Sequence, residues 1–419
     1  MTDSLKAAGP VPGPARRARR DRGARIALLG LLGLGCAACS GEPGNPHHPG
    51  LAKLCAPAGT AFAQPDGGAA ILHPLDEPPV RVDGDWEVST LEAAGIDPEP
   101  IGDMLRAVED RTYTGIDGIL IARHRQLVFE AYFDGFDRDA VHNIRSAFKS
   151  FLSTLVGIAI DRRLIAGLAQ PISTFFPDRW ADIATPDPRK ERITLGHLLT
   201  MTPGFDRQRG LDDADDWYRF ALDQPMAHEP GAAFGYNDAN SMLIGGAVAW
   251  ASGQPFADFA KATLFDPLGI TRYCWTFTPA GQPMTDGSFY MRPRDFAKLG
   301  QLYLDGGMWR GRRVVSAAWV RAATRHQIAL PPPTTRKLHV HYGYHWWVRN
   351  VRPHDDHSFA MYTASGGSQK LVVFPDLEMV VVFTGSRYVD RAAYQQPWEM
   401  LDRYILPALR DGAPNGLGH

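Results

Sequence analysis

Two pairs of apolar runs, one toward each end of the chain, predict β-hairpins. Residues 118–122 and 127–133 are rich in β-branched and aromatic side chains and are separated by four polar residues. Residues 370–374 and 379–384 have the same character and flank the turn-type sequence Pro-Asp-Leu-Glu. We therefore expect both ends of the chain to contribute strands to one antiparallel sheet.

Helical spacing dominates the rest of the pattern. Asp97 followed by Pro98 is typical of a helix start, and residues 398–409 place their leucines and isoleucine on one face. Between the hairpins, residues 150–290 combine helical periodicity with Pro- and Gly-rich loops. The expected fold class is α/β (α+β), an antiparallel sheet flanked by helices with a mostly helical inserted domain.

The first 39 residues have the pattern of an export signal. Six arginines precede the apolar run 26–34, which is too short to span a bilayer but suits the core of a signal peptide. Cys36 and Cys39 follow in Gly-Cys-Ala-Ala-Cys, a sequence that resembles the lipobox of a bacterial lipoprotein. We expect an exported protein, periplasmic or otherwise extracytoplasmic, that is either tethered to the membrane through lipidated Cys36 or Cys39 or simply secreted.

The remaining chain divides into three ranges by composition. Residues 40–96 are rich in Gly, Pro and Ala without apolar periodicity and are expected to form a linker. Residues 97–149 and 291–412 are expected to form the α/β sheet domain, and residues 150–290 the helical domain.

Composition restricts the class of protein. Of 419 residues, 44% are hydrophobic and the formal net charge is −2, which favours a folded protein and gives no basic footprint for nucleic acid. Four cysteines in this length exclude a disulfide scaffold or a cysteine-based zinc array. Cys55 and Cys274 either pair in an oxidising compartment or Cys274 stays a free buried thiol.

The sequence from Ser146 to Lys149 indicates nucleophilic chemistry. It opens the run 151–160, which is apolar on nearly every side and therefore predicts a buried helix. A buried ammonium is costly unless it is paired or neutralised, and a spacing of three residues puts Lys149 and Ser146 on one face. A serine becomes a nucleophile when a neighbour accepts its proton and N–H groups stabilise the oxyanion. The alternative is an N-cap serine beside a lysine that reaches solvent.

Ser-x-x-Lys is the nucleophile motif of class A β-lactamases and penicillin-binding proteins, and the wider sequence resembles the serine β-lactamase-related hydrolase superfamily. The resemblance is to the class C-like branch that includes esterases and 6-aminohexanoate-dimer hydrolases, and it covers roughly residues 90–410. It implies a β-lactamase/transpeptidase-like fold. The segments that carry it are 117–120, 127–133, 146–160, 197–204, 230–231, 236–245, 294–300 and 342–347.

The second motif of the family is Tyr-x-Asn, which here reads Tyr236-Asn237-Asp238. The resemblance implies that Tyr236 moves protons between the serine and the leaving group. A neighbouring Lys149 ammonium would favour the phenolate. Asp238 departs from the family pattern, and an ionised Asp238 would keep Lys149 charged, which favours a tyrosine base over a lysine base.

The third motif, Lys-Thr-Gly or His-x-Gly in the family, has Ser365-Gly366-Gly367 as its counterpart. Small residues there would let substrate approach the strand, and the N–H of Ser368 could join that of Ser146 as the oxyanion hole. Gly367 and Ser368, together with Asp238, are thus the expected substrate-binding residues. The basic residue of the motif is missing, which argues against strong penicillin turnover.

These observations predict a serine hydrolase that acts on a small-molecule ester or amide through an acyl-enzyme on Ser146. Tyr236 and Lys149 would share the general-base and general-acid roles, and no metal or organic cofactor is implied. Two alternatives stay open: a β-lactamase or D-amino-acid peptidase, and a catalytically silent penicillin-recognising binding protein.

Overall fold

The two hairpins lie at the centre of one large sheet. β4 (Gly118–Arg123) pairs with β5 (Gln126–Tyr132), β15 (Gln369–Phe374) pairs with β16 (Met379–Thr384), and β16 pairs with β4. The expectation that both ends of the chain build one antiparallel sheet is confirmed. The other strands of this sheet are β2 (Ile71–Leu72), β3 (Glu87–Val88), β11 (Ile328–Ala329), β12 (Val340–Tyr342), β13 (Trp347–Val351) and β14 (Phe359–Gly366).

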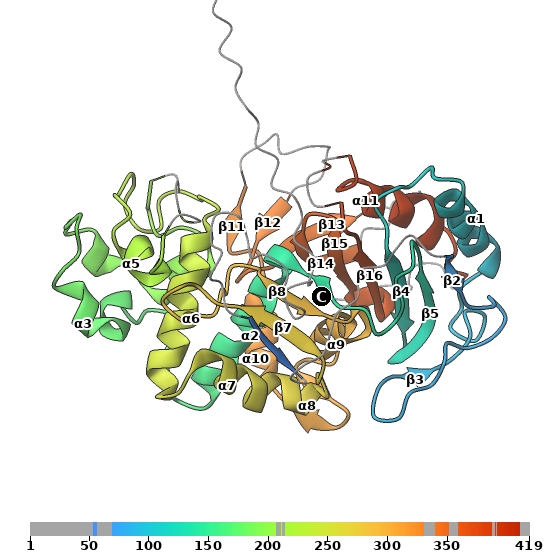
Figure 1. Cartoon of the computed structure of the whole chain (residues 1–419), viewed down its shortest axis with the longest axis horizontal. Helices are drawn as coiled ribbons and strands as arrows, with labels where there is room; N and C mark the ends of the chain where they lie inside the picture. The colour runs from blue at the N-terminus through green and yellow to red at the C-terminus, as the bar shows by residue number, and fades with distance from the viewer. Residues whose placement is uncertain are drawn as a thin grey trace, which may run out of the picture. The chain divides into compact units, whose positions relative to one another are not determined.

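The strands follow the order β11-β12-β13-β14-β15-β16-β4-β5-β2, with β3 parallel beside β5 and the other pairs antiparallel (Figure 1). This description comes from a computed structural model and covers residues 53–56, 69–206, 211, 214–330, 340–351, 359–387, 390 and 392–410. All of these residues belong to one unit of the chain, residues 32–419. The predicted export signal, with Cys36 and Cys39, lies outside the described residues.

Both faces of the central strands are buried, because alternate side chains enter two different cores. In β4, Ile119 and Ile121 pack in one hydrophobic cluster, and Leu120 and Ala122 pack in another. This explains why the strands appear in the sequence as continuous apolar runs rather than as alternating ones.

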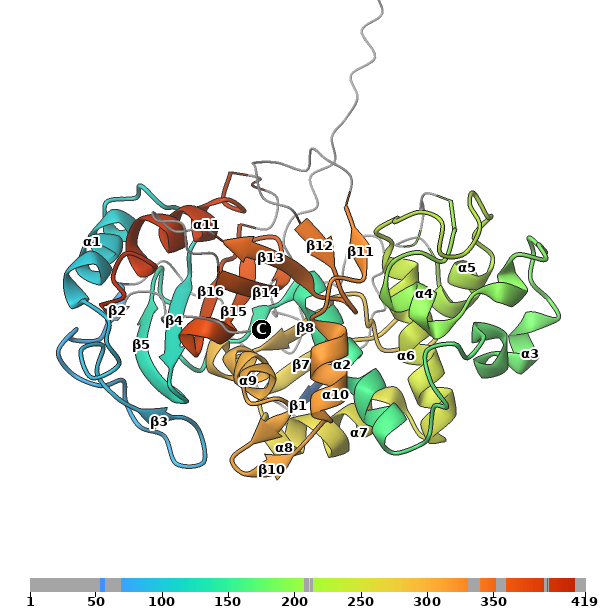
Figure 2. The ribbon, with the colours of Figure 1, turned by 180° about the vertical axis from the view of Figure 1, so that it is seen from behind.

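Helices cover each face of the sheet (Figure 2). On one face lie α1 (Pro98–Glu109), α11 (Gln396–Met400) and the π-helical turn Leu401–Ile405. On the other face α9 (Pro293–Leu304) packs against β15 and β16. The predicted start of α1 is confirmed, since Asp97 caps the helix and accepts a hydrogen bond from the Glu99 N–H at 3.1 Å.

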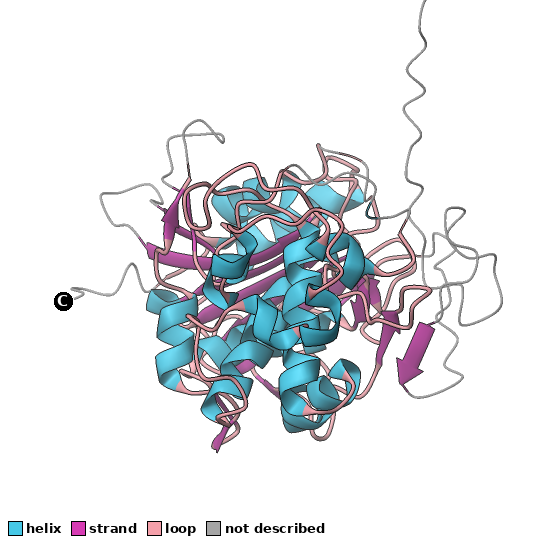
Figure 3. Cartoon of the chain, turned by 90° about the vertical axis from the view of Figure 1, so that its left-hand side faces the viewer, coloured by secondary structure: helices cyan, strands magenta, loops and turns pink. Residues whose placement is uncertain are grey.

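The middle of the chain is mainly helical and lies beside the sheet (Figure 1). When this side of the molecule faces the viewer, helices stand in front of the strands (Figure 3). Its first helix, α2 (Phe148–Asp161), follows the 3₁₀ turn Arg145–Ala147 and is buried on every side from residue 148 to 159, as its sequence predicted. The other helices are α3 (Pro177–Trp180), α4 (Leu195–Leu199), α5 (Trp217–Leu222), α6 (Asp238–Ser252), α7 (Phe256–Ala260), α8 (Asp266–Leu268) and α10 (Ala317–Ala323). Shorter turns are 3₁₀ segments at Ile172–Phe175, Lys190–Arg192 and Pro375–Leu377 and a π segment at Lys261–Phe265.

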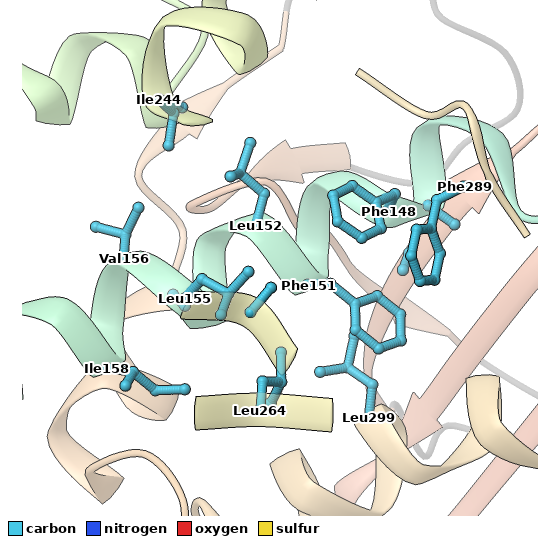
Figure 4. Packing of buried hydrophobic residues seen from close by; sticks show 14 of the residues in the cluster. Phe148, Phe151, Leu152, Leu155, Val156, Ile158, Ile244, Leu264, Phe289 and Leu299 are labelled. Carbon is cyan, nitrogen blue, oxygen red and sulfur yellow. The ribbon is translucent and has the colours of Figure 1, made fainter. Parts of the chain in front are cut away.

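One hydrophobic cluster surrounds α2 (Figure 4). Phe148 contacts Phe289 with ring centroids 4.8 Å apart, and Leu152 lies in the same cluster as Ile244 of α6. The cluster extends to Leu120 of the sheet. The helix that begins just after Ser146 is therefore fixed by packing from both the sheet and the helical region.

A second, smaller sheet was not expected from the sequence. It consists of β1 (Lys53–Ala56), β7 (Tyr273–Thr276), β8 (Phe289–Met291) and β6 (His142–Asn143), and a disulfide joins Cys55 of β1 to Cys274 of β7. A separate two-stranded ribbon is formed by β9 (Met308–Trp309) and β10 (Arg312–Arg313).

The short strands lie in two ranges for which the sequence predicted no strands. Residues 40–96, expected as a linker, include β1, β2 and β3, and residues 150–290, expected as mostly helical, include β7 and β8. Strands of two to four residues are too short to show a period of two. Their pairing depends on partners far away in the chain, so local pattern does not reveal them.

Candidate active site

Ser146 lies in the 3₁₀ turn that leads into α2. The turn is reached through a left-handed residue, Arg145, whose φ is +50° and whose N–H donates to the Asn143 side chain at 2.9 Å. Left-handed non-glycine residues are costly and concentrate at functional sites. The local backbone thus presents Ser146, which is half-buried, just ahead of a rigid helix.

Lys149 is the lysine that the sequence predicts to lie in a buried helix. The residue is 1% exposed, and its ammonium donates to Ser146 Oγ at 3.1 Å, to Asp238 Oδ1 at 2.7 Å and to the backbone carbonyl of Asp286. An ammonium has three N–H donors, and all three are used. Spacing along the helix therefore brings the Ser146 and Lys149 side chains together, as predicted.

Electrostatics keep Lys149 charged. Burial by itself lowers the pKa of this amine, but the negative charge of Asp238, with further contributions from Tyr236 and Asp286, raises the pKa above its ordinary value. A lysine that stays an ammonium cannot accept the Ser146 proton. In this resting arrangement Lys149 acts as a hydrogen-bond donor and a fixed positive charge.

The Tyr236-Asn237-Asp238 motif reaches the same place because it begins a helix. Asn237 is the N-cap of α6 and accepts the Ala239 N–H at 2.8 Å, and Asp238 is the first helical residue, where the helix dipole favours a carboxylate. Tyr236 stacks on Trp347 with centroids 6.0 Å apart.

The phenol of Tyr236 joins the other two groups. The Lys149 ammonium lies 5.2 Å from the Tyr236 ring centroid. Hydrogen bonding of the phenol with Ser146 and Lys149 lowers its pKa. Although Tyr236 as a whole is 40% exposed, desolvation around its hydroxyl raises that pKa more than Lys149 lowers it, so the pKa lies above its ordinary value. The sequence-based expectation considered only Lys149 and omitted this desolvation. Tyr236 rests as a phenol.

Two glycines approach the Ser146 backbone closely: Gly366, which belongs to the predicted third motif, and Gly287, which the sequence did not single out. A Cβ on Gly287 would lie 2.4 Å from the carbonyl carbon of Arg145, and a Cβ on Gly366 would lie 2.6 Å from the Ser146 nitrogen. Any side chain at either position would displace the turn. The Asp-Gly dipeptide at 286–287 marks a turn in the sequence, but its approach to Ser146 depends on the fold.

His345 also supports the site, although in the sequence it belongs only to segment 342–347, one of those that carry the family resemblance. Its Nδ1 lies 3.2 Å from the Lys149 carbonyl oxygen, and the Ser150 hydroxyl donates to the His345 carbonyl at 2.7 Å. Burial lowers the pKa of this imidazole to about 3, so it stays neutral and acts as a structural support for the first turn of α2.

A pocket of about 350 Å³ opens beside Ser146. Its lining residues are Ser146, Tyr236, Trp347, Arg349, Thr363, Ser365, Gly366, Gly367, Lys370, Tyr394, Gln395 and Trp398. Gly367, expected to contact substrate, is among them. Ser368, expected to supply an oxyanion N–H, is fully buried and is not a lining residue. In the two-residue turn between β14 and β15, Gly367 faces the pocket, whereas Ser368 is buried in the protein.

The pocket carries no cluster of metal ligands within the part of the chain that the structure describes, where no three His, Cys, Asp or Glu side chains gather in a suitable group. Among the same residues no helix is both long and apolar enough to cross a membrane.

The Beta-lactamase family model matches residues 106–402. The chain belongs to the Beta-lactamase family. The resemblance inferred from the sequence is thereby confirmed, and the matched range includes Ser146, Lys149 and Tyr236.

Curated relatives match parts of the chain at low identity. A 6-aminohexanoate-dimer hydrolase of Paenarthrobacter ureafaciens is 27% identical over 226 residues, which is 50% of this chain and 57% of that protein. The esterase EstB of Burkholderia gladioli is 28% identical over 192 residues, covering 39% of this chain and 48% of that protein. The chain thus spans about half the length of the curated relatives it matches.

Solved structures share the fold. A Bacillus anthracis structure that carries the name 6-aminohexanoate-dimer hydrolase superposes with a TM-score of 0.61 at 17% identity, covering 84% of this chain and 90% of that one. The predicted fold class, a helix-flanked antiparallel sheet of β-lactamase/transpeptidase type, is confirmed.

Proposed function

We propose that the protein is a serine hydrolase that cleaves a small-molecule ester or amide through an acyl-enzyme on Ser146. The observation that carries the proposal is the convergence of a hydroxyl, an ammonium and a phenol at one pocket, with Lys149 Nζ 3.1 Å from Ser146 Oγ and Tyr236 beside both. Family membership and the hydrolase names of the matched relatives support the same reaction class.

The roles of the three groups follow from their charges. Because Lys149 is held as an ammonium, Tyr236 in its minority phenolate form is the general base, and Lys149 stabilises that phenolate. The Ser146 oxygen bonds to the substrate carbonyl carbon while its proton passes to the Tyr236 oxygen. The Tyr236 phenol then gives this proton to the leaving alkoxide or amine as the scissile bond breaks.

Deacylation repeats the sequence with water as the nucleophile. Tyr236 accepts a proton from the water as its oxygen attacks the acyl carbon, and then returns a proton to Ser146 as the ester bond breaks. The oxyanion needs two aligned N–H donors. The N–H of Ser146 is one candidate, and the second comes from the strand end at 365–368, with Ser368 as the sequence-based candidate.

We also propose that the protein acts outside the cytoplasm, exported by residues 1–39 and either released or tethered through lipidated Cys36 or Cys39. The Cys55–Cys274 disulfide supports an oxidising compartment. Metabolic labelling with an alkyne fatty acid, compared between wild type and the Cys36→Ser and Cys39→Ser variants, separates a lipoprotein from a secreted protein.

The hydrolase proposal is tested by a fluorophosphonate probe and a substrate panel. The probe should label wild type and fail to label Ser146→Ala. The panel compares short 4-nitrophenyl esters, linear amide dimers and a chromogenic cephalosporin, and turnover of the first or second class supports the proposal. Cephalosporin turnover alone would favour a β-lactamase, and a folded wild type that neither reacts nor turns over substrate would favour a silent binding protein.

A further inference from the structure

The pocket beside Ser146 contains two basic side chains with no acidic partner in the described part of the chain. Arg349 projects from β13 and Lys370 from β15, and both line the pocket. Among the buried cations of the described residues, Arg294 contacts both Glu130 and Asp85, whereas Lys190 donates to the Thr185 hydroxyl and the Leu222 carbonyl. The two cations of the pocket differ from Arg294 in that no ion pair joins them to a described carboxylate.

The contacts of Lys370 place it close to the nucleophile. Lys370 is 4% exposed and donates to Ser365 Oγ at 2.9 Å and to the Gly367 carbonyl. These residues flank Gly366, whose α-carbon faces the Ser146 nitrogen. A group bound by Lys370 would therefore lie only a few bonds from a carbonyl carbon attacked by Ser146.

The guanidinium of Arg349 packs against the Trp398 ring, and one of its N–H groups donates no hydrogen bond to a described residue. Its guanidinium lies 4.7 Å from the Trp398 ring centroid, and the same ring lies 5.9 Å from Lys370 Nζ. Cation–π attraction fixes both side chains without neutralising them. Arg349 Nε is buried and has no hydrogen-bond partner among the described residues.

The positive charges of Arg349 and Lys370 lie close together, and each makes the charged form of the other less stable. Burial, with the nearby Arg349 charge, lowers the pKa of Lys370 to about 7, and burial also lowers the pKa of Arg349. Buried charges without a counter-charge are unfavourable. A bound anion would relieve this cost, satisfy the free Nε donor and complete a planar pair of hydrogen bonds to the guanidinium.

We propose that Arg349 and Lys370 bind a carboxylate of the substrate and so select esters or amides whose acyl or leaving portion is an anion. This inference rests on the proposed function and specifies its substrate class. The family's third-motif lysine is absent from the strand end, and Lys370, opposite Ser365 on the neighbouring strand, brings an ammonium into the same pocket.

The test compares two esters that differ only in charge, mono-4-nitrophenyl glutarate and its neutral methyl ester. Wild type should prefer the free carboxylate in kcat/KM by roughly tenfold or more, as a charge-assisted hydrogen bond provides. The preference should fall to about one in Arg349→Met and in Lys370→Met. Arg321→Met, which removes an exposed arginine of α10, should keep the wild-type preference and is the matched control.

A binding measurement separates this inference from the proposed function. Glutarate should bind to Ser146→Ala in calorimetry, and Arg349→Gln or Lys370→Gln in that background should weaken binding roughly tenfold. Hydrolysis of the neutral ester by wild type with no preference for the anion, and no glutarate binding, would overturn the carboxylate site while leaving the hydrolase intact. Glutarate binding without turnover of either ester would overturn the hydrolase and leave the site.

Discussion

The Nζ of Lys149 lies 2.7 Å from Oδ1 of Asp238, and this ion pair joins the first turn of α2 to the first residue of α6. Asp238 stands where the family motif has asparagine. The pair raises the pKa of Lys149 against the opposing effect of burial, so the serine faces a permanent ammonium and a protonated phenol. In the proposed mechanism the base is therefore generated by loss of a proton from Tyr236.

The first prediction concerns the pH dependence of acylation. The pKa of Tyr236 is raised, chiefly by burial, so the phenolate fraction grows about tenfold per pH unit below that pKa. We expect kcat/KM for an ester to rise steadily from about pH 6 to about pH 10. Tyr236→Phe should lose roughly 10²- to 10⁴-fold in rate. A rate that is already constant near neutral pH in wild type would contradict a tyrosine base.

The second prediction concerns Asp238→Asn. Loss of the carboxylate leaves Lys149 buried beside a neutral amide, and burial then lowers the pKa of the amine. A neutral Lys149 amine, 3.1 Å from Ser146 Oγ, can accept the serine proton. The rising limb of the pH–rate profile should move to lower pH by about one unit or more.

The control for this change is Asp258→Asn, which removes an exposed carboxylate in the first turn of α7 and should leave the profile where it is. Equal profiles for wild type and Asp238→Asn would show that the ion pair does not set the protonation state of the site. Thermal unfolding should also show that Asp238→Asn costs about 1–3 kcal/mol, because a buried donor loses a charged partner.

The third prediction concerns the glycines that contact the nucleophile turn. Gly287→Ala and Gly366→Ala would each place a methyl group within 2.6 Å of the Ser146 nitrogen, so the turn must shift. A displacement of about 1 Å can cost about 10²-fold in rate, and we expect a loss of that size in kcat. Gly235→Ala is the matched control near the site, since its Cβ would meet nothing within 4 Å. Full activity in either Gly287→Ala or Gly366→Ala would refute the close contact with the Ser146 turn.

Much of this arrangement could be predicted from local sequence. The apolar runs that became β4 and β16 and the apolar surface of α2 predicted burial, and the three-residue spacing predicted the contact between Ser146 and Lys149. In each case the information lies within one element, where periodicity fixes which side chains share a face.

The other features of the site could not be predicted, because they depend on contacts between segments that are far apart in the sequence. Gly287 and His345 act on the first turn of α2 only because the fold brings them there, and strand β1 is defined by its partner β7 rather than by its own pattern. Lys370 has the sequence context of an ordinary strand residue. Its importance is visible only when the pocket shows that it and Arg349 lack an acidic partner among the described residues.

The fourth prediction concerns a buried pair outside the pocket. Asp117 Oδ2 lies 3.6 Å from His142 Nδ1, both residues are buried, and Ser386 Oγ donates to Asp117 Oδ1 at 3.1 Å. Burial raises the pKa of Asp117 to about 7 and lowers the pKa of His142 to about 3. The folded protein therefore keeps a proton on Asp117 that the unfolded chain releases, and lacks one on His142 that the unfolded chain binds.

These two effects oppose each other in the free energy of unfolding. The Asp117 contribution falls as pH rises from about 4 to about 7, and the His142 contribution falls as pH drops from about 6.5 to about 3. Wild type should show little slope from the pair between about pH 4.5 and 6.5. Asp117→Asn should lose stability as pH falls, and His142→Gln should lose it as pH rises, each by up to about 1.4 kcal/mol per unit. Urea unfolding at several pH values measures both slopes, and slopes of the same sign in the two variants would show that the groups do not titrate as a pair.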